Sequence, residues 1–318
     1  MPPTSDPASR DRLRSLLGMD RFVPSVPAAL APTVGALSSA TAPPQLTRIL
    51  TADGRGIPAY LLRADPAVAT GAGVVLIAGH GRGIDDLVRT DPADGYHGAL
   101  AHRLVAAGLT VLCPEMESFG RRRSPAAPAS RPYAPGDSSC RIDAPRHLLT
   151  GTTLLGRRVA DAAAAADALR RLPDVDPARV AIAGGSGGGA VALLLAALDE
   201  EISAALVATY FCTFEASVLA LPHCPCTIVP GLLDPADGPA LEMADIGRLI
   251  APRPLILEAG RKDPIFPISA TRAEFARLLS AWHEPGGPGP RLVVTDEGHR
   301  FVAADSLRLF AAALAPSA

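Results

Sequence analysis

The sequence predicts an α/β fold, a mostly parallel twisted sheet with helices on both faces. From residue 73 onward, short apolar runs alternate with helix-like runs, which is the order of repeated strand–helix units. The apolar runs are continuous rather than alternating, as expected for parallel strands buried on both faces. With 318 residues, 48% of them hydrophobic, the chain can bury a core of this size.

The N-terminal part predicts a helix and a hairpin outside the repeating pattern. Residues 10–18 are amphipathic, and a Pro-, Ala- and Ser-rich stretch without regular structure is expected after them. Two apolar segments joined through an Asp-Gly dipeptide, typical of tight turns, predict a β-hairpin over about 45–63. We therefore expect a helix with an irregular extension in 1–45 and a single α/β domain in 46–318.

The remaining elements are assigned from apolar runs and from the glycines that end them. Strands are expected at 73–79, 109–114, 179–185, 202–210, 254–260 and 291–295. Helices are expected at 96–107, 156–172, 188–198, 269–282 and 304–315. Residues 118–150 carry many Pro, Arg and Ser, which predicts a long irregular insertion.

A glycine-flanked serine lies at the junction of a predicted strand and a predicted helix, in Gly184-Gly185-Ser186-Gly187-Gly188. This matches the nucleophile-elbow pattern G-x-S-x-G, in which a tight turn presents the serine hydroxyl. Glycine suits such a turn because it has no Cβ. The N–H of Gly187 is predicted to stabilise an oxyanion next to the serine.

A serine nucleophile needs a histidine base, and the histidine needs an acid that fixes its orientation. Asp263 follows the predicted strand 254–260, and His299 follows the predicted strand 291–295. Alone, Asp263 fits a turn before proline and His299 fits a surface histidine. Together they complete the chain order Ser, acid, His of one known triad arrangement. We therefore expect Ser186, Asp263 and His299 to act as a catalytic triad.

The second oxyanion donor is expected in the glycine-rich loop after the strand 73–79. The N–H of His80 is the first candidate by position, and that of Gly81 is the second. The alternative is a glycine-rich turn that contacts no ligand.

Beyond the elbow, further segments make the chain resemble the α/β-hydrolase superfamily, in its dienelactone-hydrolase-like and acetylxylan-esterase-like branch. These segments are Gly79-His-Gly-Arg-Gly, Tyr210-Phe-Cys-Thr-Phe, His223-Cys-Pro-Cys, Asp245-Ile-Gly-Arg-Leu-Ile-Ala-Pro-Arg-Pro, Lys262-Asp-Pro-Ile-Phe-Pro and Glu297-Gly-His. The resemblance implies the α/β-hydrolase fold and a serine esterase acting on a small-molecule ester. Two positions depart from the branch. Ala78 stands where relatives often have histidine, and Ser186 replaces the cysteine of dienelactone hydrolases.

Three other functions are open. A transacylase or cyclase acting on an acyl or lactone intermediate would use the same triad. A dinucleotide-binding oxidoreductase would explain Gly185-x-Gly187-x-x-Ala190, but the fingerprint lies deep in the chain and leaves Asp263 and His299 unexplained. A catalytically silent member of the fold could act as a binding protein, but such a protein would be expected to lack part of the triad.

Four residues are candidate substrate contacts. Arg121 could bind a carboxylate, although a solvated basic face is the ordinary role of Arg121 and its neighbours. Arg82 is a further candidate for substrate contact. Phe211 and Phe266 could line the pocket, although such residues more often belong to the core. The insertion 118–150 is expected to overhang the pocket and to influence substrate choice.

We expect no cofactor and no metal. Cys212, Cys224 and Cys226 with His223 lack the usual C-x₂-C spacing of zinc sites, and no second histidine accompanies His80 at ligand spacing. Buried thiols near the acyl pocket are the expected role of these cysteines.

Charge and composition restrict the partners. A net charge of −2 and a pI near 6.4 favour neither nucleic acid nor an anionic membrane. No secretory pattern or membrane-spanning apolar run is found, and the five cysteines do not form an even disulfide set. We expect a cytoplasmic protein; whether it forms homo-oligomers is open.

Overall fold

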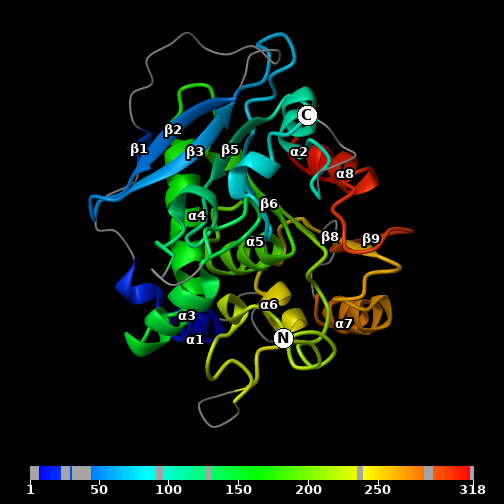
Figure 1. The fold of residues 1–318 in the computed structure, drawn as a ribbon. Helices are drawn as coiled ribbons and strands as arrows, with labels where there is room; N and C mark the ends of the chain where they lie inside the picture. Colours follow the sequence, from blue (N-terminus) through cyan, green and yellow to red (C-terminus); the bar gives the residue numbers. More distant parts are fainter. Residues whose placement is uncertain are drawn as a thin grey trace.

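The computed structural model describes residues 7–22, 29–30, 44–90, 96–126, 131–234, 239–282 and 289–315. Within these ranges nine strands form one sheet in the order β1-β2-β3-β5-β4-β6-β7-β8-β9 (Figure 1). The strands are β1 Ala29–Leu30, β2 Gln45–Leu50, β3 Gly56–Leu62, β4 Gly73–Ile77, β5 Thr110–Pro114, β6 Val180–Gly185, β7 Ala205–Ala208, β8 Leu255–Gly260 and β9 Arg291–Thr295. Neighbouring strands from β5 to β9 are parallel, which confirms the predicted fold class.

The antiparallel part of the sheet is the predicted hairpin. Strands β2 and β3 pair from Gln45↔Leu61 to Leu50↔Gly56, and β3 continues antiparallel onto β5. The turn closes through the N–H of Thr51, which donates to the carbonyl of Arg55 at 3.0 Å. The hairpin thus lengthens the sheet on the side away from β9.

Eight α-helices of the described ranges cover the two faces of the sheet (Figure 1). They are α1 Pro7–Leu16, α2 Leu100–Ala106, α3 Cys140–Leu149, α4 Leu154–Arg170, α5 Gly187–Leu198, α6 Met243–Arg248, α7 Ile268–Ala281 and α8 Asp305–Ala313. No helix in the described part of the chain is both long and apolar enough to cross a bilayer.

Side chains of the central parallel strands alternate between two hydrophobic clusters, one on each face. On β4, Val75 and Ile77 join the cluster under α4 and α5, whereas Val74 and Leu76 join the cluster under α2 and α8. This alternation follows from the two-residue period of a strand, and it explains why β4 is apolar throughout. The central strands are therefore rigid supports for the loops at their carboxyl ends.

The N-terminal helix packs onto the same core as the sheet. Leu13 and Leu17 are fully buried in the cluster under α4 and α5. The guanidinium of Arg10 donates to the carbonyls of Ala197 at 3.0 Å and Leu249 at 2.8 Å. Helix α1 thus bridges the ends of α5 and α6.

The expected irregular insertion at 118–150 contains a helix. Helix α3 begins after Ser139, and the buried carboxylate of Asp143 accepts hydrogen bonds from the hydroxyls of Ser118 at 2.7 Å and Ser139 at 2.5 Å. Pro145 lies inside the helix, where it removes one N–H donor. The prediction was wrong here because it used the proline and serine content alone. The tertiary contacts that hold α3 are not visible in the composition.

Smaller differences concern lengths and short elements. Helix α2 starts at Leu100, four residues later than expected, and α6 was not predicted. Within the stretch expected to be irregular after residue 18, Ala29–Leu30 pairs with β2, while most of that stretch lies outside the described residues.

Candidate active site

Ser186 occupies a sharp turn between β6 and α5. Its φ of 54° and ψ of −121° are unusual for a residue with a Cβ, and its N–H donates to the carbonyl of Ala208 at 2.9 Å. A Cβ at Gly184 would lie 2.3 Å from the carbonyl oxygen of Gly188, and one at Gly188 would lie 2.3 Å from that of Ile77. These close approaches explain why glycines surround the serine.

A hydrogen-bonded chain joins Ser186, His299 and Asp263. Nε2 of His299 lies 3.0 Å from Oγ of Ser186, and Nδ1 lies 2.8 Å from Oδ2 of Asp263. Asp263 is buried, and its other oxygen accepts the N–H groups of Ile265 at 2.8 Å and Phe266 at 3.1 Å. The structure therefore brings together the three residues that the sequence selects, with the acid held by two main-chain donors.

The loop that carries His299 is fixed from below by Glu258 on β8. The buried carboxylate of Glu258 accepts the N–H of Val302 at 2.7 Å and that of Ala303 at 3.0 and 3.2 Å, and it also bonds the hydroxyl of Ser306. Burial raises the pKa of Glu258, partly offset by these hydrogen bonds. Above the loop, the ring of Phe266 stacks on His299, with centroids 5.8 Å apart.

A cavity of about 520 Å³ opens at Ser186 and His299. The other lining residues are Gly79, His80, Tyr96, Gly187, Tyr210, Leu221, Pro222, His223, Cys224, Thr227, Pro264, Ile265 and Phe266. Tyr96 hydrogen-bonds Thr209, and burial raises the pKa values of Tyr96 and Tyr210, so both phenols stay protonated. Apart from its histidines, this lining carries no charged side chain.

Two main-chain segments could stabilise negative charge near Ser186. Gly187 is the first residue of α5, so its N–H has no acceptor within the helix. Gly79 and His80 line the cavity after β4, whereas Gly81 is not among the lining residues. The N–H of Gly79 donates to Nε2 of the buried His97 at 3.4 Å. Donation from Gly187 and His80 to an oxyanion stays a prediction.

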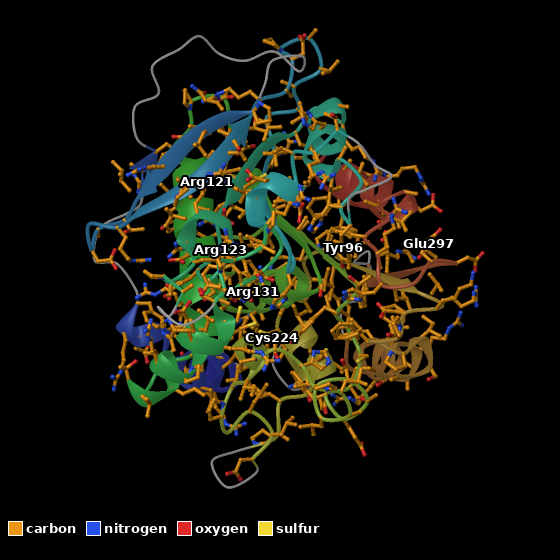
Figure 2. All side chains as sticks on the ribbon, in the orientation of Figure 1. Tyr96, Arg121, Arg123, Arg131, Cys224 and Glu297 are labelled. Atoms are coloured by element: carbon orange, nitrogen blue, oxygen red, sulfur yellow. The ribbon has the colours of Figure 1, made fainter. Side chains whose placement is uncertain are left out.

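Only one of the four candidate substrate contacts, Phe266, lies on the cavity wall. Arg121 forms an ion pair with Asp85 at 2.8 Å, and Figure 2 shows it well apart from Tyr96. Phe211 is buried in the core, and Arg82 is exposed at the surface, outside this lining. Ion pairing accounts for the position of Arg121, and core packing accounts for that of Phe211.

The outer wall of the cavity comes from a segment whose role the sequence indicated only in part. Leu221, His223 and Cys224 line it, and His223 hydrogen-bonds Ser217 at 2.9 Å. The expectation that His223 and Cys224 lie near the acyl pocket agrees with this placement. No described residue of the insertion 118–150 lines the cavity, so the expected overhang is not seen.

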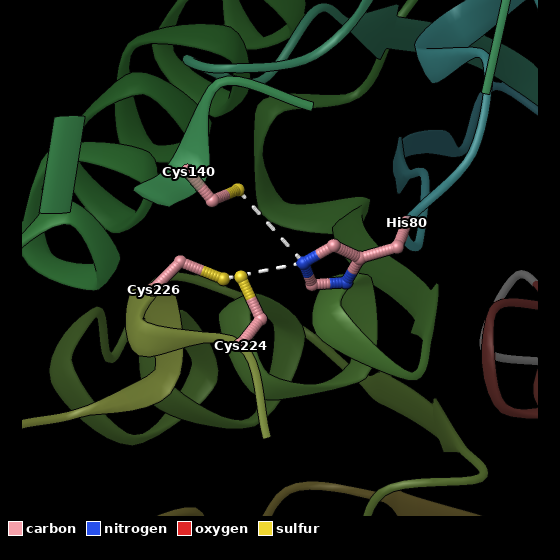
Figure 3. Close-up of side chains that lie close together, drawn as sticks. All are labelled: His80, Cys140, Cys224 and Cys226. Atoms are coloured by element: carbon pink, nitrogen blue, oxygen red, sulfur yellow. Dashed lines mark hydrogen bonds between the residues drawn. The ribbon is translucent and has the colours of Figure 1, made fainter. Parts of the chain in front are cut away.

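Four side chains beside the cavity could hold a metal ion. The ligand atoms of His80, Cys140, Cys224 and Cys226 all lie within 4.8 Å of one another (Figure 3). All four cysteine and histidine side chains come from segments with other predicted roles, and none was expected to bind a metal.

Comparisons with known proteins agree with this architecture. The family model described as acetyl xylan esterase matches residues 146–222, which include Ser186 but neither Asp263 nor His299. A Bacteroides fragilis structure described as a candidate acetyl xylan esterase aligns with a TM-score of 0.66 at 15% identity, over 91% of this chain and 75% of that chain. No curated protein sequence matches the chain significantly.

Two further solved structures are similar. A glucuronoyl esterase from Solibacter usitatus aligns with a TM-score of 0.61 at 18% identity, over 98% of this chain and 94% of that chain. A candidate dienelactone hydrolase from Klebsiella pneumoniae aligns with a TM-score of 0.52 at 18% identity, over 82% and 93%. These structures confirm the expected α/β-hydrolase fold.

Proposed function

We propose that the protein is a serine hydrolase that cleaves a carboxylic ester through an acyl-enzyme intermediate. The observation that carries the proposal is the chain of hydrogen bonds from Asp263 through His299 to Ser186, at 2.8 and 3.0 Å, at the cavity. A serine on a strained turn, a histidine at its hydroxyl and a buried acid behind the histidine are the three parts that nucleophilic catalysis by serine requires.

In the proposed mechanism, Nε2 of His299 accepts the hydroxyl proton of Ser186 while Oγ attacks the ester carbonyl. The carboxylate of Asp263 stabilises the imidazolium that forms. The N–H groups of Gly187 and His80 bind the oxyanion of the tetrahedral intermediate. The alcohol leaves with the proton from His299, and a water activated by the same histidine then hydrolyses the acyl-enzyme.

The cavity supports an uncharged acyl group as substrate. Besides its histidines, its wall carries tyrosine, phenylalanine, leucine and isoleucine side chains, and Arg82 and Arg121 lie outside it. A carboxylate in this cavity would lose its hydration without gaining a guanidinium partner. Acetyl and glucuronoyl esters, named for the similar structures, are therefore tested first, with the acetyl group as the favoured acyl part.

The test combines covalent labelling with turnover of short-chain p-nitrophenyl esters. We expect a fluorophosphonate to label Ser186, and Ser186→Ala to lower kcat by about 10³-fold or more. The matched control is Ser280→Ala, because Ser280 is exposed on α7 and only hydrogen-bonds the carbonyl of Arg277.

Equal turnover by Ser186→Ala and the wild type would overturn the proposal. Tight NADH binding without fluorophosphonate labelling would favour the dinucleotide function instead. An acyl-enzyme that reacts with an added alcohol but not with water would replace hydrolysis by acyl transfer.

A further inference from the structure

Three cysteines and a histidine from distant parts of the sequence lie close together at the loop after β4, which carries the predicted oxyanion donor His80. Nε2 of His80 lies 3.3 Å from Sγ of Cys226 and 3.9 Å from Sγ of Cys140 (Figure 3). Cys224 completes the group, in which all four ligand atoms lie within 4.8 Å of one another. We propose that these four residues bind one zinc ion as a structural site.

The spacing of the ligand atoms suits a tetrahedral zinc ion. Zinc binds cysteine sulfur at about 2.3 Å and histidine nitrogen at about 2.0 Å, which separates tetrahedral ligand atoms by about 3.5–3.8 Å. The distances from Nε2 of His80 to the two sulfurs, 3.3 and 3.9 Å, bracket this value. Small rotations of the side chains therefore suffice to coordinate the ion.

The buried charge of Arg158 is a second, independent observation. Arg158 is 1% exposed, and no carboxylate of the described residues forms an ion pair with it. Its guanidinium instead donates to Sγ of Cys140 at 3.1 Å and to the carbonyl of Glu117. A buried cation requires an anionic partner.

A bound zinc ion would give the site a net charge that balances the charge of Arg158. Zn²⁺ with three thiolates and a neutral imidazole carries one negative charge, which the guanidinium of Arg158 neutralises. On binding, the ion takes the place of the thiol protons, which leave to solvent.

The short 3₁₀ turn at Pro225–Thr227 explains how a C-x-C sequence can supply two ligands. Cys224 precedes this turn and Cys226 lies within it, and their sulfurs approach the imidazole of His80 from the same side (Figure 3). Pro225 occupies the first position of the turn, where its missing N–H costs nothing. Pro225 thus begins the turn that places both cysteines at the site.

Four protein ligands leave no open position, so the ion would be structural rather than catalytic. It would join the loop after β4, the start of α3 and the segment that forms the outer cavity wall. Binding through Nε2 places the proton of His80 on Nδ1, the nitrogen that faces Gly187, because a Cβ on Gly187 would lie 3.1 Å from it. If the proposed esterase function holds, the ion would thereby fix the loop after β4, with the predicted oxyanion donor His80, beside Ser186.

Metal analysis of the purified protein tests the site directly. We expect about one equivalent of zinc in the wild type grown with zinc, and a cobalt derivative with thiolate-to-cobalt charge transfer and tetrahedral visible bands. Ser186→Ala should keep the zinc, which separates this test from that of the proposed function. Cys113→Ala is the matched control, because Cys113 is a buried cysteine on β5 outside the cluster.

Two variants remove ligands at positions of different burial. Cys226→Ser removes a buried ligand, and His80→Ala removes an exposed one, so the second variant keeps the fold if the first does not. Each should weaken zinc binding by at least about 10-fold. A wild type that holds no zinc and gives no thiolate–cobalt spectrum would overturn the proposal. So would a reduced protein whose zinc content is unchanged in both variants, and so would a native disulfide within the cluster, seen as a mass lower by two hydrogens.

Discussion

Both carboxylate oxygens of Glu258 accept the N–H of Ala303, at 3.0 and 3.2 Å, in a site where Glu258 is 2% exposed. Ala303 has a φ of 50°, so the chain turns sharply just after the loop that carries His299. A residue with a Cβ keeps such a conformation only where its surroundings enforce it. Glu258 is therefore a positioning residue for the proposed base, although it touches neither the base nor the cavity.

We predict that Glu258→Ala lowers kcat by up to about 100-fold, because loss of both acceptors lets His299 move away from Ser186. Glu258→Gln keeps one acceptor oxygen and should be affected less. Steady-state kinetics on a short ester measures the effect, which should appear in kcat rather than in KM.

The control for this prediction is Glu297→Gln, the same change at an exposed residue two positions before His299. Its kinetics should match those of the wild type. A Glu258→Ala variant that is folded, by circular dichroism, and fully active would show that the loop is held by other contacts.

Asp263 fixes the tautomer of His299, and Asp263→Asn tests this role. An amide at Asp263 can donate to Nδ1, which favours the tautomer with its proton on Nε2, where it cannot accept the hydroxyl proton of Ser186. In a serine protease the corresponding change lowers kcat by about 10⁴-fold, and we expect a loss of similar order here. Asp296→Asn is the matched control, since Asp296 is exposed and pairs only with Arg261 among the described residues. A loss below about 10-fold would assign the acid to another residue.

The order of the parallel units and the positions of Ser186, Asp263 and His299 were predictable from the sequence. Each of these residues follows an apolar strand, and parallel strands bring their carboxyl ends to one edge of the sheet. Their mutual hydrogen bonds then follow from the fold, without any local signal that joins residues more than thirty positions apart.

The cavity wall and the cysteine cluster were less predictable, for two physical reasons. The segment that contains Leu221 and His223 has neither a helical nor a strand period, so its position depends on tertiary contacts alone. The proposed metal ligands come from three segments, and only Cys224 and Cys226 are close in sequence. The spacing of residues in a sequence pattern detects ligands that lie on one turn or hairpin. It does not detect ligands that only the folded chain brings together.

His97 predicts a specific dependence of stability on pH. Burial lowers its pKa from 6.5 to about 3 in the folded chain. Between pH 3 and pH 6.5 the unfolded chain binds more protons than the folded chain. The contribution of His97 to the free energy of unfolding is therefore complete above about pH 6.5 and decreases as the pH falls. From the pKa difference, we expect His97 to lower the free energy of unfolding by about 2 kcal/mol between pH 6.5 and pH 5.

Urea unfolding at both pH values measures the effect of His97. His97→Gln removes the titrating group and keeps an acceptor for the N–H of Gly79, so its unfolding free energy should fall less with acid than that of the wild type. His102→Gln, at a partly exposed histidine of α2, serves as control. Equal slopes for His97→Gln and the wild type would contradict a buried neutral His97.

The turn at Ser186 has no space for a methyl group at Gly184. Its Cβ would lie 2.3 Å from the carbonyl oxygen of Gly188, an atom that cannot move without displacing the start of α5 and the N–H of Gly187. We expect Gly184→Ala to lower the free energy of unfolding by about 1–3 kcal/mol and to reduce kcat as well, since strain at this turn tilts the proposed oxyanion donor. Gly136→Ala is the matched control, because a Cβ at Gly136 meets no atom within 4 Å. Urea denaturation and ester turnover on the same preparations distinguish the two effects, and a stable Gly184→Ala variant with unchanged kcat would show that the elbow tolerates a side chain there.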